Sequence, residues 1–256
     1  MTTYRGAPMM CFGLAVAALA AGCSSGGSAP GGAAPAPTSI GATSGDASGG
    51  ATVGPLDANP EGIAYPSPAS GFGRSPRSGT TPGSVIANFK FSGYPNGVIA
   101  PQLQTIALAD YFDPCGLRYK VIHLTVAARW CTPCNEETDA IEAAKAQLDA
   151  EGVVVVQALE DGTEEGHGAT QVDLNDWITQ HHTTFTEMLD PDPNPQLGVF
   201  FTQASIPWNG DIDPRTMEIL DSSPGWSGDV MTEVGPALDA VQSAPNYPLP
   251  AACNDQ

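Results

Sequence analysis

Two cysteines, Cys131 and Cys134, stand three positions apart in the stretch VAARWCTPCNEE of residues 126–137. A Cys-x-x-Cys pair can work as a redox dithiol, supply half of a zinc site, or form a plain structural bridge. A bridge over two intervening residues closes too small a loop to add much stability. The neighbouring residues must therefore decide which chemistry the pair performs.

A zinc site would need a second pair of ligands with suitable spacing. His181 and His182 are adjacent, so on a helix they point in different directions. His167 lies in a glycine-rich stretch, and His123 lies in an apolar run that indicates a hydrogen-bonded strand histidine. The acidic run at 190–196 lacks the central glycine of a calcium loop and predicts a turn. We predict no metal site.

Two more cysteines, Cys115 and Cys253, follow the N-terminal region. Together with Cys131 and Cys134 they permit three pairings. Cys131 and Cys134 are close enough in sequence to pair with each other, and an oxidising compartment favours joining the remaining two. We expect a redox-active Cys131–Cys134 disulfide and a structural Cys115–Cys253 disulfide. Free thiols at 115 and 253, or a relay that passes oxidation to the main pair, are the alternatives.

The first 23 residues place Arg5 before an apolar run that ends in small residues, the layout of a secretory signal rather than a spanning helix. Their last five, LAAGC, resemble a bacterial lipobox, with Leu19 one place further from the cysteine than is usual. We expect residues 1–22 to be a lipoprotein signal peptide and Cys23 to be lipidated, which anchors the protein in the cell envelope facing the periplasm. Ser24 is compatible with the outer membrane, and a soluble secreted form is the alternative.

The composition changes along the chain of 256 residues. Residues 23–83 are rich in Gly, Ala, Pro, Ser and Thr, and such a segment buries too little apolar surface to offset its ordering entropy. We predict a disordered tether there and a folded domain over 84–256, long enough for a sizeable core. The net charge of −19 repels phosphate backbones, so we predict no nucleic-acid partner.

The folded region alternates strand and helix patterns. Apolar runs at 119–128 and 153–160 predict buried central strands, and apolar residues at helical spacing predict helices over 135–152 and 171–182. Further patterns predict strands at 87–93 and 183–189, a loop or short turn-helix at 104–116, two strands within 207–221 and a closing helix over 228–242. This alternation indicates an α/β fold with a partly parallel sheet and helices on both faces, and it places the cysteines at a strand-to-helix joint.

A Trp-Cys-x-Pro-Cys motif that opens a helix after a central strand, with an Ile-Pro before a later hairpin, resembles the thioredoxin fold. Residues 130–134, with Glu137 three positions beyond, are similar to the TlpA/ResA-like thiol-disulfide oxidoreductases of bacterial envelopes. The resemblance covers about residues 85–245. It implies a three-layer α/β/α architecture around a central mixed sheet and an enzyme without a cofactor, a protein-disulfide reductase rather than an oxidase.

The chemistry of the pair follows from its place. A thiolate is the nucleophile, and the N-terminus of a helix lowers the pKa of a cysteine there. Cys131 is therefore the expected attacking residue, and Cys134, nearly one turn later, resolves the mixed disulfide.

The resemblance implies further roles. Pro207 corresponds to the cis-proline that faces the cysteines, so that Ile206 can offer its backbone to an extended substrate. Trp130 would cover the pair. Thioredoxin itself has a buried proton-handling Asp where this chain has Thr125, and the resemblance assigns proton transfer for Cys134 to Glu137. The alternative for Glu137 is a carboxylate that only favours the helix N-terminus.

The implied partners are protein thiols and disulfides, together with a membrane electron donor that re-reduces the enzyme. Two other functions stay open. A peroxiredoxin-like peroxidase would have a Pro-x-x-x-Thr/Ser-x-x run before its cysteine, where this chain has TVAARW. A non-enzymatic copper- or partner-binding module on this fold usually has Cys-x3-Cys and a distant His.

Overall fold

The central strand of the sheet is β3, Val121–Ala128, and all eight of its residues are buried. A continuous run of apolar and β-branched residues forms this strand because both of its faces are covered. The computed structural model describes residues 56–66, 79–202, 205–243 and 249–255. All of them belong to the second of the two units into which the chain divides, 51–256.

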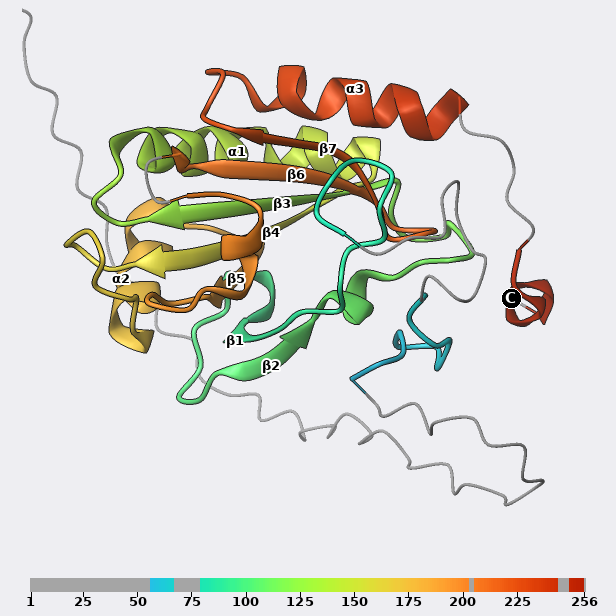
Figure 1. Cartoon of the computed structure of the whole chain (residues 1–256), viewed down its shortest axis with the longest axis horizontal. Helices are drawn as coiled ribbons and strands as arrows, with labels where there is room; N and C mark the ends of the chain where they lie inside the picture. The colour runs from blue at the N-terminus through green and yellow to red at the C-terminus, as the bar shows by residue number, and fades with distance from the viewer. Residues whose placement is uncertain (1–55, 67–78, 203–204, 244–248, 256) are drawn as a thin grey trace, which may run out of the picture. The chain divides into compact units, whose positions relative to one another are not determined.

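Seven strands form one mixed sheet in the order β2-β1-β5-β4-β3-β6-β7 (Figure 1). β3, β4 and β5 run parallel, and the other neighbours pair antiparallel. The remaining strands are β1 (Lys90–Tyr94), β2 (Gln104–Ala107), β4 (Val153–Asp161), β5 (Thr186–Leu189), β6 (Trp208–Asp213) and β7 (Glu218–Pro224). The parallel strands thus all end at one edge of the sheet, the edge at which the cysteines follow β3.

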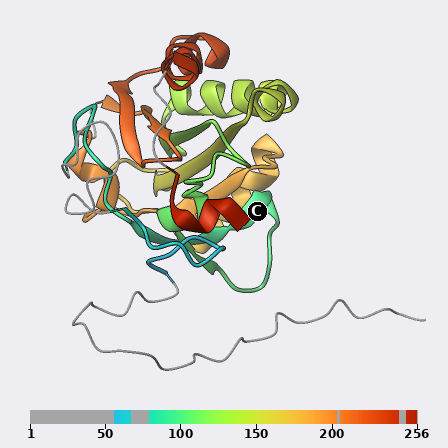
Figure 2. The same cartoon turned by 90° about the vertical axis from the view of Figure 1, so that its right-hand side faces the viewer.

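Three α-helices pack on one face of the sheet, and Figures 1 and 2 show α3 beside α1 on that face. They are α1 (Thr132–Glu151), α2 (Gln171–His181) and α3 (Val230–Ser243). Side chains of α1 and α3 cover alternate residues of the central strands, such as Val121 and Val155. Short 3-10 helices η3 (Leu108–Tyr111) and η4 (Gln196–Val199) cover the opposite face together with loops. Two more single turns are η2 (Pro95–Gly97) and η6 (Ala251–Asp255).

The layers differ from the expectation in one respect: all α-helices lie on one face. β3-α1-β4 and β4-α2-β5 are successive crossovers between parallel neighbours that advance in the same direction across the sheet. Crossovers of the usual right hand then place both helices on the same face. Among its described residues, the connection from β5 to β6 contains 3-10 turns but no α-helix, so the third layer consists of turns and loops.

Local differences are small. The segment at 104–107, expected as a loop, forms strand β2, and β1 begins at Lys90 rather than at residue 87. Helix α1 begins three residues before its predicted start, because Pro133 suits the first turn of a helix, where a backbone N–H has no helical partner. The helix ends where Gly152 adopts a left-handed conformation with φ of 81°.

Residues 56–66 pack against the domain, although the composition placed them in the tether. The Asn59 amide donates to the Phe112 carbonyl at 3.1 Å, and the Tyr65 hydroxyl donates to the Ile86 carbonyl at 2.9 Å. The Tyr65 ring also contacts that of Phe112, with 5.9 Å between centroids. The folded domain therefore includes a short stretch before residue 84. The expected signal peptide, residues 1–22, and the expected lipidation site Cys23 lie outside the described residues.

A disulfide joins Cys115, in the loop before β3, to Cys253 near the C-terminus. The two residues are 138 positions apart in the sequence, so the bond links the end of the chain to the entrance of the central strand. In the described portions of the chain, no helix is both long enough and apolar enough to cross a membrane.

Candidate active site

The second disulfide joins Cys131 to Cys134 at the joint between β3 and α1. Cys131 is the N-cap of α1, and its Sγ accepts a hydrogen bond from the Cys134 backbone N–H at 3.2 Å. Cys131 retains 3% exposure and Cys134 none. A partner can therefore reach the pair only through Cys131. The helix N-terminus would stabilise a thiolate at that position, because unpaired N–H groups and the positive end of the dipole face it.

The peptide bond between Ile206 and Pro207 is cis, and it leads directly into β6. The Ile206 carbonyl oxygen lies 3.9 Å from Cys131 Sγ. The structure therefore brings Cys131, Ile206 and Pro207 together, although they are 75 positions apart. A backbone carbonyl next to a sulfur atom is where an extended peptide could be held while its cysteine meets Cys131.

Trp130 lies beside the disulfide among the apolar residues that surround it, with part of its surface exposed. Its Nε1–H donates to the Asp161 carboxylate at 3.0 Å, and the Gly166 N–H donates to the same oxygen at 2.7 Å. Asp161 is the last residue of β4. The indole is thus fixed by the neighbouring parallel strand.

Glu137, one turn after Cys134 on α1, is fully buried. Its Oε1 accepts a hydrogen bond from the Asn209 amide on β6 at 2.7 Å, and its Oε2 has no hydrogen-bond partner among the described residues. Burial raises the pKa of this carboxyl to about 8, against the smaller lowering effects of His123 and Asn209. The group therefore exchanges protons in the range in which thiols also titrate. That property suits a carboxyl that takes up or releases a proton near neutral pH.

His123 on β3 is also fully buried, and its Nδ1 lies 2.8 Å from Asp211 Oδ1 on β6. Burial lowers the pKa of His123, but the Asp211 carboxylate, with smaller effects of Glu137 and Glu233, raises the pKa above its usual value. His123 is thus a hydrogen-bonded strand histidine, as its apolar surroundings indicate. Its charge acts on Glu137 through the interior of the domain.

Thr125 stands where thioredoxin has its buried Asp, and it is part of a neutral network. Its Oγ1 accepts from the Gln157 amide of β4 at 2.9 Å. Gln157 in turn accepts from Trp177 Nε1 of α2 at 2.8 Å and contacts Thr138 of α1. These bonds fix α1 and α2 on the sheet beneath the cysteines without adding a charge there.

Sequence reasoning missed Asn209 and Asp211, which hold Glu137 and His123. The residues from 208 to 211 are more polar than is usual in a central strand, so the sequence alone leaves their register open. Asn209, Asp211 and Asp213 alternate with Trp208, Gly210 and Ile212. That period of two is the signal that would have found a polar face turned toward α1, because successive strand residues point to opposite faces.

The strand order, the two parallel crossovers and the cis-proline beside a Cys-x-x-Cys at the N-terminus of a helix identify the architecture. The fold is thioredoxin-like. No protein-family model matches this sequence, and no curated protein matches it.

Solved structures align with the thioredoxin-like domain. A secreted thiol-disulfide isomerase from Corynebacterium glutamicum is 16% identical with a TM-score of 0.46, over 62% of this chain and 86% of that one. AhpC from Enterococcus faecalis is 12% identical with a TM-score of 0.48, over 67% of this chain and 99% of that one. The pneumococcal exposed lipoprotein thioredoxin Etrx1 from Streptococcus pneumoniae is 22% identical with a TM-score of 0.41, over 62% of this chain and 100% of that one. These likenesses concern the fold alone.

Proposed function

We propose that this protein is a thiol-disulfide oxidoreductase of the TlpA/ResA-like type, which reduces protein disulfides through Cys131 and Cys134. The observation that carries the proposal is the position of Cys131 Sγ. It caps α1, accepts the Cys134 N–H, and lies 3.9 Å from the Ile206 carbonyl oxygen, beside the cis-proline. A sulfur in this place is activated by the helix and adjoins backbone that can hold a peptide.

The reaction starts from the reduced pair. The Cys131 thiolate attacks one sulfur of the substrate disulfide, which forms a mixed disulfide and releases the other substrate sulfur as a thiolate that takes up a proton. Cys134 then loses its proton, for which Glu137 is the proposed acceptor, and attacks Cys131 Sγ. The second substrate thiol leaves, and the Cys131–Cys134 disulfide seen in the structure is the product. Two electrons have passed to the substrate.

The cellular setting is part of the same proposal. Cys23 carries the lipid anchor after removal of residues 1–22, and the domain works on the outer side of the inner membrane or at the outer membrane. A membrane electron donor returns the pair to the dithiol form. The signal-like N-terminus and the lipobox-like LAAGC support this placement.

Serine substitutions test the roles of the two cysteines. With dithiothreitol as the electron source, we expect the Cys131→Ser variant to lose the ability to reduce insulin disulfides. The variant should still fold. Cys134→Ser should instead accumulate a mixed disulfide with the substrate, which mass spectrometry detects, because the resolving sulfur is absent. Cys253→Ser is the matched control outside the site and should retain turnover. Activity in Cys131→Ser would refute the assignment of the nucleophile.

The reduction potential tests the direction of electron flow. Equilibration with glutathione buffers should give a value near or below about −250 mV for a reductase. A value near about −120 mV, which is typical of a strong oxidant, would overturn the reductase assignment and leave the oxidoreductase chemistry intact.

A further inference from the structure

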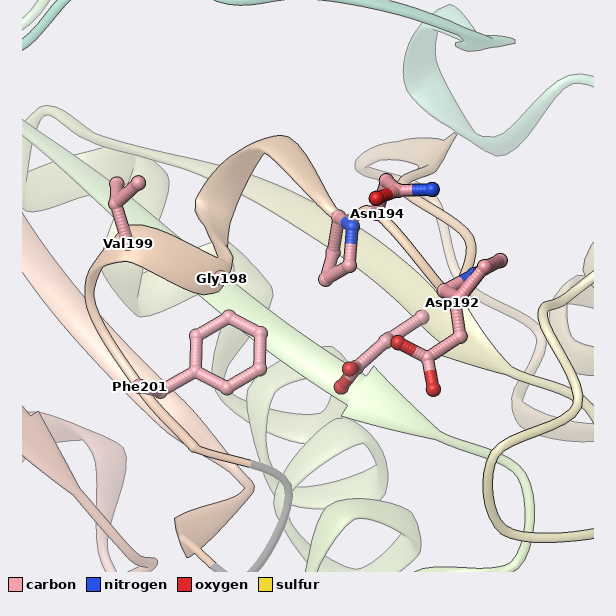
Figure 3. A pocket seen from close by; sticks show the side chains of 8 residues that line it. Asp192, Asn194, Gly198, Val199 and Phe201 are labelled. Carbon is pink, nitrogen blue, oxygen red and sulfur yellow. The ribbon is translucent and has the colours of Figure 1, made fainter.

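A cavity of about 440 Å³ lies at the ends of β4 and β5, on the sheet face opposite the α-helices. It is lined by Glu160, Asp192, Pro193, Asn194, Pro195, Gly198, Val199 and Phe201. Figure 3 shows the Asp192 carboxylate and the Phe201 ring facing this space from different parts of the loop that connects β5 to β6. The cavity thus combines carboxylates with apolar and aromatic walls.

Glu160 lies at a bulge in β4, on the face of the strand that also carries Val156 and Ala158. Ala127 of β3 pairs with Leu159 and Ala128 pairs with Asp161, so Glu160 is an extra residue without a partner on β3. Bulges often lie next to active sites. Glu160 is 1% exposed; its carboxyl shares a hydrogen bond with Asp192, and its Oε2 has no hydrogen-bond partner among the described residues. A ligand that supplies a donor would satisfy this buried oxygen.

The charges around Glu160 all have the same sign. Burial, which has the largest effect, the neighbouring carboxylates of Asp192, Asp161 and Asp190, and a hydrogen bond with Asp192 together raise the pKa of its carboxyl to about 8. Every group that acts on this pKa disfavours the ionised form. A cation in the cavity would lower the pKa of Glu160, since an opposite charge within a few ångströms favours ionisation of a carboxyl group.

The cavity is connected to the disulfide along both of its sides. On one side, Asp161 directly follows Glu160 and holds the indole of Trp130. On the other side, the chain from Phe201 leads to Ile206, whose carbonyl oxygen lies beside Cys131 Sγ. The cavity and the disulfide therefore lie at the same edge of the sheet, where the parallel strands end.

We propose that this cavity binds a lysine or arginine side chain of the protein substrate, close in sequence to the cysteine that Cys131 attacks. The aliphatic stem would pack on Pro193, Pro195 and Val199, and the charged head would meet Asp192 and Glu160 with the Phe201 ring beside it. This subsite deepens the proposed oxidoreductase function and depends on it.

Matched peptides test the subsite. Each peptide carries one cysteine in a mixed disulfide with 2-mercaptoethanol. A lysine or a glutamine occupies one of the three positions before this cysteine or one of the three positions after it. Reduction is followed with dithiothreitol as the electron source, and each rate is divided by the rate of the same protein on neutral bis(2-hydroxyethyl) disulfide. We expect kcat/KM about tenfold higher for lysine than for glutamine at one or two positions.

Substitutions separate the cavity from the general charge of the molecule, because a net charge of −19 attracts any cationic peptide. Glu160→Gln and Asp192→Asn should each lower the lysine preference to about threefold or less. Asp239→Asn, on the exposed side of α3, removes the same charge and should keep the full preference. A lysine-to-glutamine ratio near one at every position, or a ratio unchanged in both cavity variants, would overturn the subsite. Failure to reduce the neutral disulfide would overturn the oxidoreductase function itself.

Discussion

Glu137 is the residue whose chemistry depends most on its surroundings. Its side chain is excluded from water, and its carboxyl is held at one oxygen by Asn209 and left without a hydrogen bond at the other. An exposed glutamate in the first turn of a helix would be ionised at neutral pH and would only interact with the helix dipole. The burial of Glu137 instead supports a proton acceptor for Cys134.

Replacement of Glu137 by glutamine tests this role. The amide keeps the shape but cannot take up a proton, so we expect release of the mixed disulfide to slow at least about tenfold. The rise of that rate as pH passes through about 8, where the carboxyl ionises, should also disappear. Stopped-flow measurement of substrate release in a single turnover gives both quantities. Glu136→Gln alters an exposed neighbour and should behave as the unmodified protein; equal rates and pH profiles in both variants would exclude Glu137 from proton transfer.

The sequence places the cysteines and Glu137 close together because they follow one another along one predicted helix, and their roles in the reaction stay predictions. It could not predict Asn209, His123 and Asp211 as a buried group, because their meeting depends on the register between β3 and β6. That register pairs His123 with Asp211 and Thr125 with Asn209. Glu160 was missed for a related reason, since the cavity that it lines is completed by residues 192–201, which only the fold brings beside the end of β4.

At the scale of elements, the buried strands and long helices were predictable because periodicity and apolar runs extend over many residues. Element β2 and the segment 56–66 were not. The composition of residues 23–83 is an average over the whole segment, and it does not show that a few residues can hold 56–66 to the domain. Asn59 and Tyr65 are two of these residues. The placement of every α-helix on one face depends on the order of strands, which periodicity does not contain.

The segment 56–66 should contribute measurably to stability. We compare a variant that lacks residues 1–55 with one that lacks residues 1–66. We expect the shorter protein to unfold with a free energy lower by about 2 to 4 kcal/mol, because it loses the hydrogen bonds of Asn59 and Tyr65 and the contact between Tyr65 and Phe112. The exposed polar contacts of 56–66 with Asn88, Lys90 and Arg118 are lost as well. Urea titration measures the difference. Tyr65→Phe in the longer variant removes only the hydroxyl and should cost about 1 kcal/mol. Equal stability of both truncated proteins would show that residues 56–66 do not contribute to the stability of the domain.

The whole molecule is strongly acidic, yet it buries several carboxyl groups inside the domain. Burial raises the pKa of Glu137 and that of Glu160 to about 8, and it raises the pKa of Glu187 well above its usual value. An unfolded glutamate titrates near 4.5. Between these pH values the folded state holds more protons than the unfolded state. The stability that Glu137 and Glu160 contribute in this way is therefore fully present below about pH 4.5 and is lost as pH rises through about 8.

We expect the free energy of unfolding to fall as pH rises from 5 to 8, by up to about 1.4 kcal/mol per pH unit for each such group. Urea unfolding at each pH gives the slope. General repulsion within an acidic molecule would also lower stability at high pH, so the decisive comparison is between variants. Glu137→Gln and Glu160→Gln should each flatten the slope, and each should be more stable than the unmodified protein at pH 8, because the amide needs no proton to remain neutral. Glu136→Gln removes the same charge from the surface and should leave the slope unchanged. If all three variants followed the slope of the unmodified protein, the pH dependence would come from general charge, and the buried carboxyls would have ordinary pKa values.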